Sequence, residues 1–262
     1  MAKLSMTVRD YMTPSVVSVG EGATLEEVLD TLHARDISSV LVVDDKGAAR
    51  GVVSMTDLLR ASRIEGGHSG DPLRVFPRQL HARDVMKSPL FEVAADAQVG
   101  EAASKLLAHT IHRLFVRDGD TIVGVFSTRD AMRVVLYLRV PTPIRHVMTQ
   151  DVATIALGDS IDEALAKLDE TNVRGLVVVD GTVPVGVFTQ LEAIRARALP
   201  DALRKNAVEE VMSYETICLD ADTPLYRAAG HGIAMQVRRL LVVHQRSLCG
   251  VLTGYDLART LA

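Results

Sequence analysis

The segment Gly51-Val-Val-Ser54-Met-Thr-Asp57 decides the fold of this chain, because its pattern returns three more times. Each copy has a glycine, a pair of apolar residues, a hydroxyl residue and then a carboxylate. The later copies run from Gly124 to Asp130, from Gly186 to Glu192 and from Gly250 to Asp256. A methionine precedes each copy at a nearly constant distance, at Met12, Met86, Met148 and Met212. A unit of about 55 residues is longer than a typical solenoid repeat, so the pattern indicates a small domain present in four copies, repeats 1 to 4.

Within each repeat the hydrophobic period changes in the same order. A short β-like stretch comes first, at residues 16–19, 90–93, 152–155 and 216–219. An amphipathic helix is predicted next, with apolar residues at i, i+3, i+4 and i+7, as in Leu25, Val28, Leu29 and Leu32. Capping boxes mark two of these helix starts. They pair Thr24 with Glu27 and Ser160 with Glu163.

A pair of strands and a second helix complete the repeat. In repeat 1 the two strands flank the turn Asp45-Lys-Gly47. The turn contains Asp118-Gly119 in repeat 2 and Asp180-Gly181 in repeat 3, which is a strong signal for a hairpin. The second helix is expected to begin near Thr56, Thr128, Gln190 and Gly254. The predicted fold class is therefore α/β (α+β), with four β-α-β-β-α units.

Such a unit is marginal alone, since a domain of this size buries only about 60% of the surface of its unfolded chain. Nearly continuous apolar strands such as residues 176–179 also need cover on both faces. We therefore expect repeat 1 to pair with repeat 2, and repeat 3 with repeat 4. The expected domains are residues 8–62, 82–138, 144–197 and 208–262, with linkers at 63–81 and 198–207.

Composition excludes several classes of protein. The chain has 262 residues and a net charge of −4, so it offers no general basic surface for nucleic acid. Its beginning has no apolar signal segment, and the apolar run 134–140 is too short to span a bilayer, so we expect a cytoplasmic protein without membrane contact. Two cysteines, Cys218 and Cys249, give neither a disulfide framework nor a zinc pattern. Phosphate-loop, nucleophile-elbow and metalloprotease motifs are absent from the sequence, which favours a non-enzyme.

The methionine-led segment, the amphipathic helix and the repeated Gly-to-Asp signature resemble the cystathionine-β-synthase (CBS) domain. Four copies in register cover nearly the whole chain. The resemblance implies two CBS pairs, or Bateman modules, stacked as a disc, a layout similar to the gamma subunit of AMP-activated protein kinase. It also implies adenosine-containing ligands in clefts between paired domains, and regulation of a partner protein or of a second copy of the chain.

The signature itself supports two interpretations. A hydroxyl three residues before a carboxylate is what a helix capping box requires. The same helix start also suits a phosphate, because free backbone N–H groups and the helix dipole favour an anion there. The resemblance implies that the aspartates bind ribose and that the hydroxyl residues bind phosphate. These candidates are Ser54, Thr56 and Asp57; Ser127, Arg129 and Asp130; Thr189 and Glu192; and Thr253 and Asp256. The longer Glu192 side chain makes the third site doubtful.

Cations before the second strand add to this interpretation. They are His112, Arg113, Arg174, Arg238 and Arg239, whereas repeat 1 has Ser38-Ser39. Paired cations leading into a buried strand are poor core residues, and His112-Arg113-Leu114 resembles a phosphate-binding segment of the kinase gamma subunit. The adenine is expected to lie near the start of each repeat's first strand. The residues concerned are Val16, Val17, Leu90, Phe91, Val152, Ala153, Thr216 and Ile217.

The sequence therefore predicts a non-catalytic sensor of AMP, ADP or ATP, with magnesium as an optional companion of the nucleotide. Two alternatives stay open at this point. The ligand could instead be S-adenosylmethionine, NAD or a dinucleotide, although the cations favour phosphates. The repeats could also form a ligand-free scaffold or dimerisation module, in which the signatures are helix caps alone.

Overall fold

A computed structural model describes residues 6–62, 75–171 and 173–262. Residues 63–74 of the predicted first linker lie outside the described residues. The chain divides into two compact units. Unit 1 contains the chain up to Val16, Phe91–Val152 and Glu215–Ala262, and unit 2 contains Val17–Leu90 and Ala153–Tyr214.

Each repeat forms a three-stranded sheet whose second strand is central. The first strand is parallel to the second, and the third is antiparallel to it. The sheets are β1 (Ser18–Gly20), β2 (Ser39–Val43) and β3 (Ala49–Ser54); β4 (Glu92–Ala94), β5 (Arg113–Asp118) and β6 (Thr121–Ser127); β7 (Thr154–Ala156), β8 (Gly175–Asp180) and β9 (Val183–Thr189); and β10 (Cys218–Asp220), β11 (Arg239–His244) and β12 (Ser247–Thr253). The first strands begin two residues later than predicted, because parallel pairing starts only at Ser18 and its equivalents.

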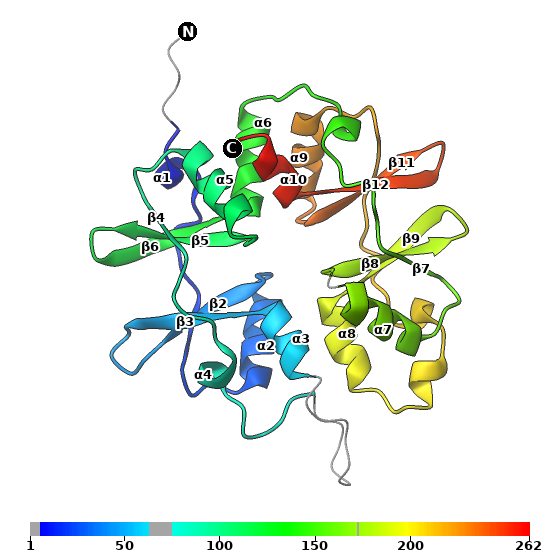
Figure 1. The fold of residues 1–262 in the computed structure, drawn as a ribbon, viewed down its shortest axis with the longest axis horizontal. Helices are drawn as coiled ribbons and strands as arrows, with labels where there is room; N and C mark the ends of the chain where they lie inside the picture. The colour runs from blue at the N-terminus through cyan, green and yellow to red at the C-terminus, as the bar shows by residue number, and fades with distance from the viewer. Residues whose placement is uncertain (1–5, 63–74, 172) are drawn as a thin grey trace. The chain divides into compact units, whose positions relative to one another are not determined.

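Two main helices follow the predicted pattern in every repeat (Figure 1). The first helices are α2 (Leu25–Ala34), α5 (Val99–Ala108), α7 (Ile161–Thr171) and α9 (Leu225–Ala234). The second helices are α3 (Met55–Ala61), α6 (Thr128–Tyr137), α8 (Gln190–Arg197) and α10 (Gly254–Arg259). Both predicted capping boxes are confirmed, since the N–H groups of Thr24 and Ser160 donate to Glu27 and Glu163 over 2.8 and 2.7 Å.

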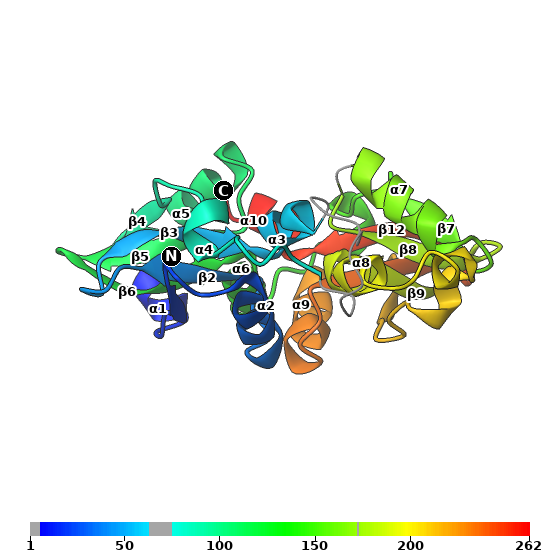
Figure 2. The same ribbon diagram turned by 90° about the horizontal axis from the view of Figure 1, so that it is seen from below.

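The methionine segments are exchanged between repeats. In repeat 1 this segment includes the short helix α1 (Val8–Tyr11), which lies beside the β4–β6 sheet of repeat 2 (Figures 1 and 2). Thr13 N–H donates to the carbonyl of Val125 over 2.9 Å, and Val125 N–H donates back over 3.0 Å. The methionine segment of repeat 2 contains the short helix α4 (Ala82–Val85) and is followed by Lys87, which forms the same reciprocal bridge with Val52. Equivalent bridges join Thr149 with Val251 and Ser213 with Val187.

The signature glycine makes each exchange sterically feasible. A Cβ atom at Gly124 would lie 2.7 Å from the carbonyl oxygen of Thr13 and 2.8 Å from Sδ of Met12. Gly51 stands in the same way against Met86, Gly186 against Met212, and Gly250 against Met148. The glycine is thus required for close approach of another backbone. The exchange links repeat 1 with repeat 2 and repeat 3 with repeat 4, which is the predicted pairing.

Inside unit 1, helices of repeats 2 and 4 pack together. Helix α6 lies against α9 and α10 (Figure 1). Gly254 opens α10 so close to α6 that an added Cβ would be 2.4 Å from the carbonyl oxygen of Thr128. The hydroxyl of Tyr255 donates to the carbonyl of Leu107, at the end of α5, over 3.1 Å.

Unit 2 joins repeats 1 and 3 through a shared core. One apolar cluster contains buried residues of both repeats, among them Leu25, Leu58, Leu168 and Ile194. Helix α3 packs on α8, which the sequence pattern did not predict. The predicted apolar faces of the first helices are buried in both units, because the side chains at i, i+3, i+4 and i+7 turn toward these cores.

Candidate ligand-binding site

Three signature aspartates are almost fully buried. Asp57 is 5% exposed, Asp130 1% and Asp256 2%. In each, Oδ2 accepts hydrogen bonds from the backbone N–H and the hydroxyl of the cap residue, which is Ser54, Ser127 or Thr253. The capping interpretation of the signature is therefore correct at these positions, and it uses one carboxylate oxygen.

The second oxygen of each aspartate meets the exchanged segment. Oδ1 of Asp130 accepts from the Thr13 hydroxyl over 3.3 Å. Oδ1 of Asp256 accepts in the same way from Thr149 over 3.0 Å. Oδ1 of Asp57 instead forms an ion pair with Nζ of Lys87 at 3.0 Å. Each carboxylate thus belongs to one repeat and its second partner to the paired repeat.

In repeats 2 and 4, an arginine one turn further along the helix forms an ion pair with the signature aspartate. Arg133 Nη1 lies 2.6 Å from Oδ1 of Asp130, and Arg259 pairs with Asp256 in the same way. Both arginine side chains are about half exposed, whereas the aspartates are buried. These two sites therefore combine a carboxylate, a hydroxyl and a guanidinium.

The residue after each methionine was missed by sequence reasoning. Thr13, Lys87, Thr149 and Ser213 stand at this position. The sequence did contain a signal for this position, because it follows the methionine in every repeat and carries a hydroxyl in three copies and a cation in the fourth. The exchange of segments, which sequence spacing does not reveal, brings Thr13, Lys87 and Thr149 to the carboxylates and Ser213 to the pocket beside Glu192.

Repeat 3 places its glutamate beside a pocket. Oε2 of Glu192 accepts from the N–H of Thr189 over 2.9 Å and from its hydroxyl, so the longer side chain still closes the capping box. A pocket of about 350 Å³ opens next to it within unit 2. Its lining residues are Glu192, Arg195, Ala196, Leu199, Val211, Met212 and Ser213. The carboxylate, guanidinium and hydroxyl types of repeats 2 and 4 thus recur around this cavity.

Antiparallel pairing brings the predicted cations to the signature hydroxyls. Arg113 lies opposite Ser127 in the ladder, and Arg239 lies opposite Thr253. In repeat 3 Gly175 is opposite Thr189, and Arg174 is one residue earlier. In repeat 1 the residue opposite Ser54 is Ser39. Repeats 2 and 4 therefore bring a cation, a hydroxyl and a carboxylate to one strand end.

Basic side chains of repeat 2 also contact residues of repeat 4 inside unit 1. The His112 ring lies 5.3 Å from the ring of Tyr255, the second residue of α10. Nη2 of Arg129 donates to the carbonyl of Gln236 over 3.1 Å, just before Arg238. In unit 2 the corresponding contact is uncharged, because the Gln190 amide donates to the Thr56 hydroxyl over 3.1 Å.

The residues expected near adenine lie before the first strands and are mostly half-buried. Val17, Phe91, Ala153 and Ile217 each accept a backbone hydrogen bond from the second strand through their carbonyl groups. Phe91 is 43% exposed, and its ring lies 4.6 Å from that of His109. The remaining candidates are Val16, Leu90, Val152 and Thr216, which are also half-buried.

The electrostatics of Asp130 are dominated by burial, which raises the pKa of this carboxyl above its ordinary value. Hydrogen bonds from Ser127 and the charge of Arg133 act in the opposite direction but do not cancel it. A buried carboxylate of this kind gains from a ligand that donates hydrogen bonds to its second oxygen, because such donors stabilise the charged form.

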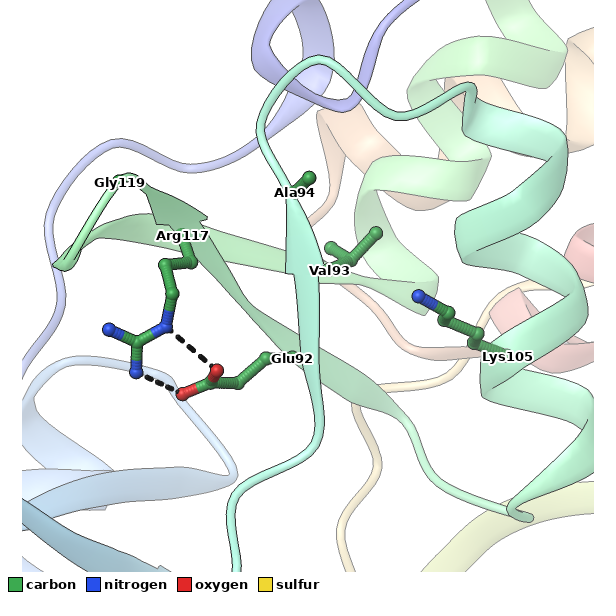
Figure 3. Close-up of a pocket in the computed structure, with 6 residues that line it drawn as sticks. All are labelled: Glu92, Val93, Ala94, Lys105, Arg117 and Gly119. Carbon is green, nitrogen blue, oxygen red and sulfur yellow. Dashed lines mark hydrogen bonds and ion pairs between the residues drawn. The ribbon is translucent and has the colours of Figure 1, made fainter.

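A second pocket, of about 250 Å³, lies apart from the signature residues (Figure 3). Arg117 and Glu92 face each other there through hydrogen bonds of 2.8 and 2.5 Å, while Lys105 reaches from α5 toward β4. The Arg117 hydrogen bonds lower the pKa of Glu92. In the described residues, there is no cluster of metal-ligating side chains, and no helix there is both long and apolar enough to cross a membrane.

Comparison with known proteins identifies a sequence relative over nearly the whole chain and two solved structures with the same fold. An uncharacterized protein of Methanocaldococcus jannaschii, MJ1404, is 24% identical over 99% of this chain, which spans 62% of that protein's length. Crystallised MJ1225 of the same organism, proposed to be an archaeal homologue of g-AMPK, has a TM-score of 0.80 and 18% identity, covering 98% of this chain and all of that one. An uncharacterized conserved protein of Pyrococcus horikoshii has a TM-score of 0.68 and 20% identity, with the same coverage.

The profile of the CBS domain matches four segments, residues 8–64, 82–137, 144–199 and 208–262. These segments contain all four signatures and nearly the whole chain. The chain therefore belongs to the CBS domain family.

Proposed function

We propose that this chain is a non-catalytic regulatory sensor that binds adenine nucleotides at its signature carboxylates. The observation that carries the proposal is the set of groups at Asp130 and Asp256, where a buried carboxylate meets a hydroxyl from another repeat and a helix start. The second carboxylate oxygen suits the ribose hydroxyls, which donate hydrogen bonds. The helix start and the cation opposite the cap hydroxyl suit a phosphate.

The charges favour a phosphorylated ligand over S-adenosylmethionine, which carries a sulfonium cation. Arg113 and Arg239 stand at the two strand ends, and Arg129 and His112 contact residues of repeat 4. Charge-assisted hydrogen bonds contribute about 1.5–3 kcal/mol each, so two or three would supply much of a micromolar affinity of about 8 kcal/mol. A di- or triphosphate would bring Mg²⁺ with it. NAD and dinucleotides share the same adenosine and phosphate groups.

Occupancy is proposed to act on a partner protein or on a second copy of the chain. A ligand can shift a conformational equilibrium only through its differential affinity for the two states. Because each site joins segments of two repeats, binding there would favour one packing of the exchanged segment over another. That packing is the structural change a partner would detect.

The test compares ligand-induced thermal stabilisation in wild type and in the variant Asp130→Ala/Asp256→Ala. A ligand at 100 times its Kd stabilises by about 2.7 kcal/mol, and AMP, ADP and ATP should do so in the wild type. Removing a cap residue costs about 1 kcal/mol in any interpretation. The variant Glu163→Ala therefore serves as the control, since it removes a capping carboxylate outside the site. It should keep the ligand response that the double variant loses.

The alternative of a ligand-free scaffold is favoured by one observation, namely that each signature carboxylate does cap its helix. It predicts a loss of about 1 kcal/mol for each capping carboxylate removed, so about twice as much in the double variant as in Glu163→Ala, with no response to AMP, ADP, ATP, NAD or S-adenosylmethionine in any of them. That result would refute the sensor function.

A further inference from the structure

We propose that the pocket beside Glu192, the repeat 3 pocket, binds a zwitterionic amino acid with an apolar side chain. Glu192 would accept from the ammonium group of the ligand, and Arg195 would donate to its carboxylate. All residues that line the pocket belong to unit 2. The site is separate from the nucleotide sites proposed at Asp130 and Asp256 and does not depend on them.

The two charged side chains at the pocket are not paired with each other. Oε2 of Glu192 closes the capping box by accepting from Thr189. Within the part of the chain that the structure describes, Oε1 of Glu192 has no hydrogen-bond partner, and the Arg195 guanidinium has neither a hydrogen bond nor an ion pair. The two residues are three positions apart on α8, so they share one face of the helix. One acceptor and one donor of opposite charge are therefore left for a ligand.

The other three repeats neutralise the equivalent carboxylate with a cation of the chain itself. These pairs are Asp57 with Lys87, Asp130 with Arg133, and Asp256 with Arg259. Arg259 also donates to the carbonyl of Val147 over 3.1 Å, which fixes the guanidinium in repeat 4. Among the described residues, Glu192 is thus the signature carboxylate that keeps an oxygen atom without an internal cation.

Repeat 3 also has smaller side chains where repeat 2 has aromatic ones. Tyr137 and Tyr11 of repeat 2 stand at the sequence positions of Leu199 and Val211. The two tyrosine rings contact each other edge to face, with centroids 6.0 Å apart. With leucine and valine at these positions, a cavity of about 350 Å³ is lined by α8 and residues 211–213. This volume is in the range of small-molecule sites, which is roughly 300–1,000 Å³.

The charges and the walls of the pocket determine the class of ligand. One carboxylate and one guanidinium make the site neutral, so a ligand with one ammonium and one carboxylate satisfies both groups. The phosphate dianion of AMP would leave negative charge without a partner. The wall is apolar, and Ala196 and Met212 are buried residues that belong to the core of unit 2. Such a wall stabilises an apolar side chain by removing its surface from water.

The residues expected to hold a nucleotide in repeat 3 do not line this pocket. Ala153, expected near adenine, and Arg174, expected near phosphate, are both absent from its lining. Of the candidates for a nucleotide site, the pocket includes Glu192 alone. The ligand of the repeat 3 pocket therefore needs neither an adenine nor a phosphate.

The experiment uses isothermal titration calorimetry of L-leucine into the full chain. Glu192→Gln and Arg195→Ala should each weaken leucine binding by about 10- to 100-fold, since each removes a charge-assisted hydrogen bond. Glutamine can still close a capping box, so Glu192→Gln keeps the helix start. Glu170→Gln is the matched control, because it removes an exposed carboxylate of α7 that does not line the pocket. It should bind leucine as the wild type does.

Two analogues and one filling variant test the assigned contacts. L-leucinamide has no carboxylate and should bind Arg195→Ala as well as L-leucine does. 4-Methylpentanoate has no ammonium group and should bind Glu192→Gln as well as L-leucine does. Leu199→Tyr brings the aromatic residue of repeat 2 into the cavity and should abolish leucine binding without loss of fold, as measured by circular dichroism.

Three results would overturn the proposal. The first is a wild-type chain that binds none of L-valine, L-leucine and L-methionine, which would mean that Arg195 and Glu192 neutralise each other in solution. The second is equal binding of 4-methylpentanoate and L-leucine by the wild type. The third is displacement of leucine by AMP in Asp130→Ala/Asp256→Ala, which would make the pocket a nucleotide site. Failure of the nucleotide proposal shows separately, as an absence of AMP binding by a chain that still binds leucine.

Discussion

Replacing Gly124 by alanine should test the exchange of methionine segments, on which every candidate site depends. The new Cβ would lie 2.7 Å from the carbonyl oxygen of Thr13 and 2.8 Å from Sδ of Met12. Ordinary van der Waals contact begins at 3.4 Å, so the exchanged segment must retreat by several tenths of an ångström. This retreat strains the reciprocal hydrogen bonds between Thr13 and Val125.

The loss of stability expected in Gly124→Ala follows from two opposing effects. Overpacking a well-filled site costs about 1–3 kcal/mol, and weakening two backbone hydrogen bonds costs about 0.5–1.5 kcal/mol each. Replacing a strand glycine by alanine returns about 0.5–1 kcal/mol through the unfolded chain. The expected net loss is about 3 kcal/mol, or about 6–12 °C in Tm for a chain of this size. Gly20→Ala is the control, because a Cβ at this strand glycine would meet nothing within 4 Å.

A double-mutant cycle in urea then decides which repeat Met12 contacts. With exchange, Met12→Ala should relieve part of the clash in Gly124→Ala, giving a coupling energy of at least about 0.5 kcal/mol. Met12→Ala and Gly51→Ala should be additive, because Gly51 faces Met86 and Lys87. Coupling of Met12 with Gly51 instead of Gly124 would mean that each segment packs on its own repeat, and the exchange would be refuted.

Two further changes probe other parts of the fold. Gly254→Ala should destabilise unit 1 by about 1–3 kcal/mol, because its Cβ would press on the backbone of Thr128. Gly22→Ala is the control, since a Cβ there meets nothing within 4 Å. Equal melting temperatures of the two variants would contradict this packing. Hydrogen bonds from Lys205 and Arg204 lower the pKa of Asp162 in the folded chain. The contribution of Asp162 to stability is therefore complete above the ordinary pKa of 3.8, and it is lost as the pH falls through the lower pKa of the folded state. Asp162→Asn should therefore flatten the acid limb of the stability curve measured by urea unfolding, and an unchanged limb would contradict the assignment.

The elements of each repeat could be predicted because their signals are local. A helix face such as Leu25, Val28 and Leu32 is set by spacing along one segment, and all three side chains are buried. The hairpin turns are equally local, and Gly47, Gly119 and Gly181 have the positive φ angles that their position requires. For such features the chain needs no distant partner to adopt the predicted conformation.

The exchange and the composition of the units could not be predicted in this way. A methionine at constant spacing is equally compatible with packing on its own repeat or on the next one. The spacing also did not show that repeats 1 and 3 share a core. The apolar faces of the repeats have similar residues, so these faces do not indicate which repeats pack together. The candidate carboxylates were found from their signature, but their partners Thr13, Lys87 and Thr149 depend on contacts far apart in sequence.

Helix capping and the proposed ligand binding need not compete for the signature carboxylate, because they would use different oxygen atoms. The cap holds Oδ2 of Asp130 and Asp256 and so fixes the direction of Oδ1 before any ligand arrives. A group held in its binding orientation loses less conformational entropy on binding, which favours affinity. Removing an aspartate therefore disturbs both roles at once and separates them poorly. Substitution of Thr13 or Thr149 leaves the cap intact and removes one of the two partners of Oδ1, the other being Arg133 or Arg259, so that position is where helix capping and the proposed ligand binding can be measured separately.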